Sequence, residues 1–414
     1  MNSTALVLAV RHLALVLLLA TAALLGDTSA ARADGPLTLK ATLSLASSAN
    51  DLIVDGILAY VATDKGLTIV NISDLNNLSV VASVASVKGN HSLGLAKKGP
   101  YVYLAAGTAG MQVIDVSSCS TPAACAPHTV ATVAKAGRIF DVAVHPTEDA
   151  AYSVSYNGEL YVWDTSPLKN HLPPALTQTL GVIRWGVAPC NSCIERMSNG
   201  ITNGQSYLTG VTTAGNVVVT ADWGYGGLYS WDSANPLQLK FRGTHRLKNS
   251  MSRMEIDLAH PDGPVVYVLL TYGGKGSGAF SVPLSRFYTS DLSAPAIQSY
   301  SAHSNTPHND PTVCPVCGQL DSVGPMDGGG IGFSANHKYA FYVGGRGNGE
   351  LRIINVRDPV HMFAVPLATI PVGPPVIGLH AGKEAGIVSS GDHLFVAAGL
   401  AGFRVYECPG LSAP

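Results

Sequence analysis

The sequence predicts an all-β protein, and three observations support this fold class. The 414 residues include 44 glycines and 25 prolines, a composition typical of chains with many tight turns. Between the turns lie short segments in which apolar and polar residues alternate, the pattern of half-buried strands. One such pattern also recurs along the chain, which indicates a repeat architecture.

The repeat consists of two apolar strands joined by a glycine turn, which is the signature of a β-hairpin. A further apolar strand precedes most copies and another follows, so each repeat predicts four antiparallel strands. Seven such repeats predict a seven-bladed β-propeller, because a β-sandwich would not repeat one phrase and a β-helix repeat is shorter. The copies lie at 59–74, 101–118, 150–167, 217–236, 265–286, 339–359 and 393–410.

The N-terminal strand is predicted to close the last blade. The seventh copy ends at Cys408 and leaves no room for a fourth strand. Residues 37–47 form an apolar strand with no hairpin of its own. Placed beside the seventh copy, this strand would complete the blade and leave no open sheet edge.

Residues 1–33 have the pattern of a secretory signal peptide. The apolar run LALVLLLATAALL is too short to span a bilayer, and the stretch TSAARAD offers a cleavage site before Asp34. The propeller domain is therefore predicted at 34–414, in a secreted or periplasmic protein without a membrane span. A charged content of 13% and a formal net charge of −2 give no footprint for nucleic acid. We expect a monomer.

Three copies carry a family resemblance. The phrases GLTIVNISD, GMQVIDVSS and GELRIINVRDP resemble LVIVD repeats, which occur in exported bacterial propellers. The resemblance covers nearly the whole predicted domain, and it implies the fold and export. It offers no catalytic residues for transfer to this chain, and the third to fifth copies depart from the phrase, as in WDTSP and WDSANP.

Two insertions, at 184–207 and 303–330, lengthen the spacing between neighbouring copies. Each falls after the outer strand of one blade and before the inner strand of the next. This junction lies on the same face as the hairpin turns, and we call it the insertion face. Loops placed on one face of a rigid scaffold commonly carry function.

Each insertion contains one Cys-x-x-Cys pair, and three interpretations of these pairs stay open. The four thiolates could form one structural site for Zn²⁺ or iron, which would be the only cofactor implied. An oxidising compartment favours disulfides within or between the loops instead. A redox-active pair is the third interpretation. The residues are Cys190, Cys193, Cys314 and Cys317.

The remaining cysteines are predicted to be structural. Cys119 and Cys125 lie between the third and fourth strands of the second blade, where we expect a local disulfide. Cys408 is the odd one of seven, either buried or free.

Polar residues in the second insertion, and polar residues that lead into the inner strands near the central channel, are candidates for ligand binding or catalysis. Histidines and acids in a loop can bind a metal or act as a base. Propeller channels are also lined with polar residues that only solvate the hole. The candidate set is His91, Arg138, Arg253, Glu255, His303, His308, Asp327, His380 and Glu384.

Two functions follow from these features. The first is a secreted, non-catalytic propeller that binds a protein, glycan or small ligand on the insertion face. The second is an exported hydrolase, lyase or oxidoreductase that uses a metal or a His/Asp cluster there. The chain contains no G-x-S-x-G, H-E-x-x-H, Walker or dinucleotide motif, so the sequence favours the binding protein.

Overall fold

The computed structural model describes residues 38–87, 93–134, 137–181, 207–222, 227–246, 251–257, 265–270, 278–283, 300–303, 327–334, 338–346, 350–355, 363–364, 370–371, 386–409 and 411. Within these ranges the chain is built from β-strands, with short 3-10 helices at Ser117–Ser120, Pro122–Ala124 and Ser166–Asn170 and no α-helix. No helix in the described part is long and apolar enough to cross a membrane. The predicted signal peptide at 1–33 lies outside the described residues.

The described strands group into seven antiparallel sheets. The first sheet holds β2 (Ala49–Asp55), β3 (Leu58–Thr63), β4 (Gly66–Asn71) and β5 (Ser79–Ala85). The second holds β6 (Leu95–Lys98), β7 (Tyr101–Ala105), β8 (Met111–Asp115) and β9 (His128–Val133). The third holds β10 (Ile139–Val144), β11 (Ala150–Ser155), β12 (Glu159–Asp164) and β13 (Ala175–Gly181).

The other sheets repeat this order. The fourth holds β14 (Leu208–Ala214), β15 (Val217–Asp222), β16 (Gly227–Asp232) and β17 (Lys240–Arg246). The fifth holds β18 (Met251–Asp257), β19 (Val265–Leu270), β20 (Gly278–Pro283) and β21 (Tyr300–His303). The sixth holds β22 (Asp327–Phe333), β23 (Tyr339–Arg346), β24 (Glu350–Asn355), β25 (Phe363–Ala364) and β26 (Ile370–Pro371). The last holds β27 (Ile387–Ser390), β28 (His393–Ala397), β29 (Phe403–Glu407) and β1 (Thr38–Leu43).

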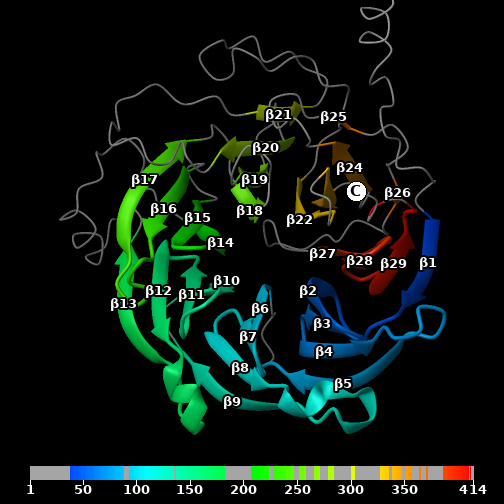
Figure 1. Ribbon diagram of the computed structural model, residues 1–414, viewed down its shortest axis with the longest axis horizontal. Coiled ribbons are helices and arrows are strands. Elements are labelled where there is room, and N and C mark those ends of the chain that lie inside the picture. The colour runs from blue at the N-terminus through cyan, green and yellow to red at the C-terminus, as the bar shows by residue number, and fades with distance from the viewer. Residues whose placement is uncertain are drawn as a thin grey trace, which may run out of the picture.

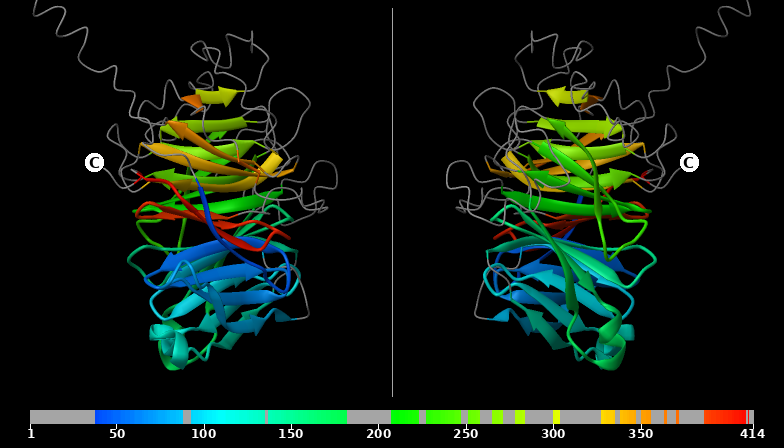
Figure 2. Two further views of the ribbon diagram at one scale, coloured as in Figure 1. Left: turned by 90° about the vertical axis from the view of Figure 1, so that its right-hand side faces the viewer. Right: turned by 90° about the vertical axis from the view of Figure 1, so that its left-hand side faces the viewer.

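The sheets are arranged around a common centre, with one strand of each sheet innermost (Figure 1). These inner strands contact one another in the order β2, β6, β10, β14, β18, β22 and β27, and β27 contacts β2 again. Side views show that the ring is thinner than it is wide, so it has two broad faces (Figure 2).

The predicted role of the N-terminal strand is confirmed. β1 pairs antiparallel with β29, from Thr38 opposite Glu407 to Leu43 opposite Phe403. The first and last described strands therefore share one sheet, which supplies that sheet with its fourth strand.

The hairpin turns depend on glycine for two reasons. Gly66 and Gly110, at the turns before β4 and β8, have φ values of +128° and +96°. A Cβ atom at either position would also collide with backbone of the fourth strand of the same sheet. Only glycine meets both conditions, and this is why the turn glycine was visible as a repeat in the sequence.

Aligned apolar side chains hold neighbouring sheets together. The strand registers place one such residue at the same level of each inner strand, and all of them are at most 6% exposed. Burial of apolar surface is the main force that packs sheets face to face. The ring comprises Leu52, Leu95, Val142, Val211, Met254, Ile331 and Ile387.

Candidate functional site: the insertion face and the central channel

The chain segments that flank the predicted insertions lie on one face of the ring. β13 ends at Gly181, which pairs with Glu159 beside the β11–β12 turn. β21 ends at His303, which pairs with Gly278 at the start of β20. Both flanks therefore lie at the turns between the second and third strands, which define the insertion face.

The insertions themselves fall largely outside the described residues, which stop at 181 and 303 and resume at 207 and 327. The predicted ligand set Cys190, Cys193, Cys314 and Cys317 lies outside them as well. The choice between a metal site and disulfides therefore stays a prediction.

Two buried aspartates link neighbouring inner strands just inside this face. Oδ2 of Asp51, on β2, accepts a hydrogen bond of 3.3 Å from the backbone N–H of Leu95, on β6. Oδ2 of Asp141, on β10, accepts one of 3.0 Å from the backbone N–H of Val211, on β14. Asp51 and Asp141 are 2% and 8% exposed, so these carboxylates are part of the framework of the ring.

Glycines make room for these carboxylates. The residue of β14 at the level of Asp141 is Gly210, which pairs with Ala221 as Asp141 pairs with Val154. Gly386 precedes β27, and a Cβ atom there would lie 2.5 Å from Oδ1 of Asp51. At this level acidic residues and glycines therefore lie side by side around part of the channel.

A central cavity of about 440 Å³ lies between the inner strands of all seven sheets. Its walls are of mixed character, and their polar part includes half-buried Glu255 and the hydroxyl groups of Thr212, Thr213 and Ser389. Lys97 also lines it, and its Nζ lies 2.7 Å from Oδ2 of Asp55. Among the described residues, no three His, Cys, Asp or Glu side chains are grouped so that they could hold a metal ion.

An aromatic stack lies at the mouth of this channel on the insertion face. Phe140 and Tyr156 are stacked with ring centroids 5.4 Å apart, and Tyr156 and Tyr207 are stacked at 4.2 Å. The Arg138 guanidinium lies over the Phe140 ring, 5.4 Å from its centroid. Phe140 is buried, whereas Arg138, Tyr156 and Tyr207 are half-buried and present an aromatic and cationic edge to the solvent.

Polar residues of the first sheet complete this cluster. The side-chain amide of Asn50 donates a hydrogen bond of 2.9 Å to Oδ1 of Asp64, in the β3–β4 turn. Burial lowers the pKa of Arg138 from its ordinary value, while the nearby charges of Asp64 and Tyr156 act in the opposite direction. Burial raises the pKa of Tyr156, and so does Tyr207. The guanidinium, the two phenols and the Asp64 carboxylate thus share one electrostatic neighbourhood, the mouth cluster.

The structure places some of the predicted candidate residues and leaves others outside the described ranges. Arg138 lies at the mouth and Glu255 lines the channel. Arg253 and Glu255 lie within β18, not ahead of it, because that strand starts at Met251. For Arg253, His303 and Asp327 the structure places the strand backbone only. His91, His308, His380 and Glu384 lie outside the described residues, so their convergence stays a prediction.

The sequence reasoning missed the aromatic residues of the mouth cluster. Tyr156 stands in the glycine turn of the third copy, and Tyr207 directly precedes the first strand of the fourth sheet. An aromatic residue at a solvent-facing turn of a repeat was the available signal. Their stacking depends on the packing of two neighbouring sheets, which the repeat pattern alone does not specify.

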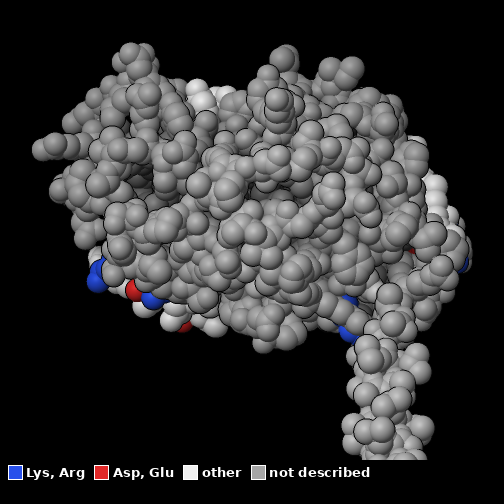
Figure 3. Space-filling view, turned by 90° about the horizontal axis from the view of Figure 1, so that it is seen from above, with Lys and Arg blue, Asp and Glu red and all other residues white. Residues whose placement is uncertain are grey.

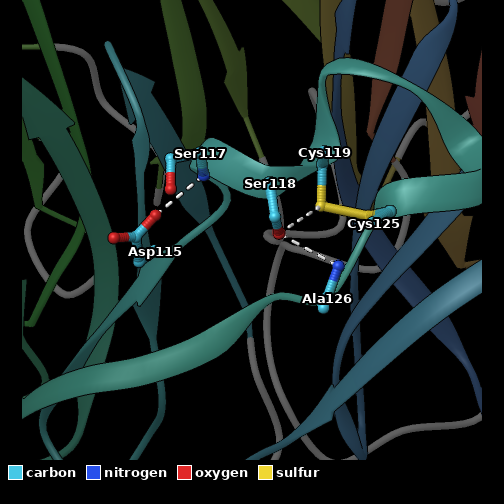
Figure 4. The surroundings of a disulfide bond; sticks show 6 residues. All are labelled: Asp115, Ser117, Ser118, Cys119, Cys125 and Ala126. Carbon is cyan, nitrogen blue, oxygen red and sulfur yellow. Dashed lines mark hydrogen bonds between the residues drawn. A yellow bond between two sulfur atoms is a disulfide. The ribbon is translucent and has the colours of Figure 1, made fainter.

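The predicted disulfide lies away from the insertion face, between β8 and β9. Cys119 and Cys125 are bonded, with their Cα atoms 3.9 Å apart (Figure 4). The backbone N–H of Ala126 donates a hydrogen bond of 3.0 Å to Oγ of Ser118, which fastens the same loop. Cys408 is a buried free thiol, and burial raises its pKa to about 11.

On the rim of the ring that is uppermost in Figure 1, a few charged residues of the described chain are visible. The Lys, Arg, Asp and Glu side chains visible there are scattered, and both positive and negative charges occur (Figure 3). This view agrees with the formal net charge of −2 and shows no field of one sign over those residues.

Comparison with solved structures identifies the architecture. The β-propeller domain of Myceliophteria thermophila Cps50 (Swd1) matches with a TM-score of 0.59 and 12% identity over 90% of this chain and 99% of that one. The structure of U3-55K matches with a TM-score of 0.60 and 12% identity over 90% and 100%. At such low identity the likeness concerns the fold alone, and it confirms a β-propeller.

Comparison with family models finds the LVIVD repeat at residues 46–86 and 91–126. The first match spans the whole first sheet, and the second spans β6 to β8 and the disulfide loop. A comparison with curated proteins gave no match. The chain is thus a β-propeller that contains LVIVD repeats.

Proposed function

We propose that the protein is a secreted or periplasmic, seven-bladed β-propeller that acts as a monomer and binds a partner on its insertion face. The closed order of inner-strand contacts, from β2 to β27 and back, supports the number of blades. The signal-peptide pattern and the Cys119–Cys125 disulfide support export, because disulfides persist in oxidising compartments.

The mouth cluster is the observation that carries the binding function. Arg138, Tyr156 and Tyr207 are half-buried, and arginine and tyrosine are the residue types that most often anchor bound partners. The cluster also lies on the face that holds Gly181 and His303, the described residues after which the two predicted insertions begin. Rigid sheets beneath it hold the side chains in place, which lowers the entropic cost of binding.

Binding is favoured over catalysis by the state of the described acids. Asp51 and Asp141 accept backbone hydrogen bonds that join inner strands, so a catalytic role would compete with their structural one. A general base needs a carboxylate or imidazole free to reach a substrate proton.

The two Cys-x-x-Cys pairs are proposed to fasten the insertions over this face, as a Zn²⁺ tetrathiolate or as disulfides. Metal analysis of the mature protein with thiol counting distinguishes the two forms. One zinc per chain, with thiols recovered after chelation, supports the tetrathiolate. A metal-free protein in which Cys190, Cys193, Cys314 and Cys317 are all oxidised supports disulfides.

Site-specific photo-crosslinking tests the binding face. A photoreactive residue is introduced at Leu400, 70% exposed in the β28–β29 turn of the insertion face. The matched control carries it at Leu172, 57% exposed between β12 and β13 on the other face. Crosslinking in the intact extracytoplasmic fraction is expected at Leu400 and absent at Leu172. Equal crosslinking at both positions would refute the proposed face.

A further inference from the structure

We infer that the mouth cluster binds a neutral glycan, a chain of uncharged pyranose sugars. This inference rests on the proposed function and names the chemical class of its ligand. The cluster combines stacked aromatic rings, hydrogen-bond donors and acceptors, and charges of both signs. Each of these features limits the chemical class of ligand that the cluster would bind.

The aromatic part supplies a surface for the apolar faces of sugar rings. Tyr156 and Tyr207 are stacked at 4.2 Å with an interplanar angle of 30°, so each ring packs against the other. Phe140, at 2% exposure, supports Tyr156 from the protein interior. Both tyrosines are half-buried, and a ring that is held in place before binding costs little entropy to use.

The polar part matches sugar hydroxyls, which both donate and accept hydrogen bonds. Arg138 and the two phenols donate, while the Asp64 carboxylate accepts. The Asn50 amide lies beside Asp64, to which it donates a hydrogen bond of 2.9 Å. These groups come from the first, third and fourth sheets, so a ligand that touches them all spans the mouth of the channel.

The charge balance favours an uncharged ligand. Asp64 acts on Arg138 in the direction that stabilises its cation, so the cluster holds one charge of each sign. A site built for an anionic sugar would leave its arginine without such a carboxylate neighbour.

The test uses isothermal titration calorimetry of the mature protein with defined hexasaccharides. The neutral probes are hexasaccharides of β-1,4-linked glucose, α-1,4-linked glucose, N-acetylglucosamine, xylose and mannose. The acidic control is the hexasaccharide of galacturonic acid. We expect at least one neutral probe to bind and the acidic control to bind at least about tenfold more weakly, a difference of about 1.4 kcal/mol.

Variants then assign the binding to the cluster. Tyr207→Ala is expected to weaken binding of that probe at least about tenfold, and Tyr207→Phe to keep it within about threefold, because the ring carries the stacking. Tyr207→Leu removes the aromatic ring but keeps an apolar side chain, and it replaces the alanine variant in this test if that variant does not fold. Leu172→Ala, on the opposite face, is the matched control and is expected to bind like the wild type.

Each outcome decides the inference. Loss on Tyr207→Ala with retention on Tyr207→Phe and Leu172→Ala supports it. Binding that Tyr207→Ala and Tyr207→Leu leave unchanged overturns it, as does preference for the acidic hexamer. If no probe binds while Leu400 crosslinks to a protein, the glycan is wrong and the proposed function stands. If no probe binds and crosslinking does not distinguish Leu400 from Leu172, both fail.

Discussion

The carboxylate of Asp51 accepts a hydrogen bond from the backbone N–H of Leu95, 44 positions later in the chain and on the next inner strand. Asp141 makes the same link to Val211, 70 positions later. Both aspartates follow a β-bulge at the start of their strands. An acidic residue at this position therefore joins one blade to the next near the insertion face.

The Asp51→Ala variant is expected to unfold more easily than the wild type. It leaves the backbone N–H groups of Leu52 and Leu95 without their carboxylate partner, at a cost of about 1–3 kcal/mol in the free energy of unfolding. Urea titration followed by circular dichroism measures this change. Glu407→Gln is the control, because its pair with Lys40 is 3.7 Å long and exposed, worth less than about 1 kcal/mol. Equal losses in the two variants would contradict the structural role of Asp51.

The Gly386→Ala variant tests the close approach beside the same aspartate. The added Cβ would lie 2.5 Å from Oδ1 of Asp51 and 2.7 Å from the backbone N of Leu52, so the strand must shift. We expect a loss of about 1–3 kcal/mol in stability, as for overpacked cores, and more than for Gly391→Ala. At Gly391 no atom lies within 4 Å of an added Cβ, so only the φ of +57° disfavours alanine there. A smaller effect at Gly386 than at Gly391 would show that the inner strands adjust freely.

Local signals made the fold predictable from the sequence, and long-range contacts kept the site from being predicted in full. The turn at Gly110 is visible because positive φ and close packing both demand glycine. Arg138 was found because it stands directly before an inner strand. Tyr156 and Tyr207 come from different sheets, and nothing in the spacing of the repeats specifies that their rings meet. Asp51 was missed for the same reason, since its partner lies on another blade.

The Thr220→Val variant tests a buried hydrogen bond in the fourth sheet. Nε1 of Trp231 donates to Oγ1 of Thr220 at 3.2 Å, and Trp231 is 1% exposed. Valine keeps the volume but leaves a buried indole N–H without this acceptor, which costs about 1–3 kcal/mol. Thermal unfolding followed by near-ultraviolet circular dichroism measures the loss. The half-buried Thr68, changed to valine, is the control, and a similar loss there would mean that the hydroxyl of Thr220 contributes nothing specific.

Removing the disulfide is expected to lower stability without changing the binding face. The Cys119→Ser, Cys125→Ser double variant opens a loop with a sequence separation of 6, for which the chain-entropy model gives about 2 kcal/mol. Urea titration measures the loss, and mass spectrometry of the unreduced wild type is expected to show the cross-linked peptide. Crosslinking through Leu400 should persist in the variant. A free thiol at Cys119 in exported protein would contradict the disulfide.

The buried thiol of Cys408 predicts a specific dependence of stability on pH. Burial, and secondarily Asp392, raise its pKa in the folded protein from 9.0 to about 11. The neutral thiol is favoured in the fold, so its contribution is fully present below pH 9 and is lost as the pH rises toward 11, because the unfolded chain ionises first. Urea titrations across this window should show a steeper loss of stability for the wild type than for Cys408→Ala. Buried tyrosines such as Tyr103 remain in both proteins, so the difference between the two slopes isolates the thiol. Parallel slopes would show that Cys408 ionises equally well in the folded and unfolded chain.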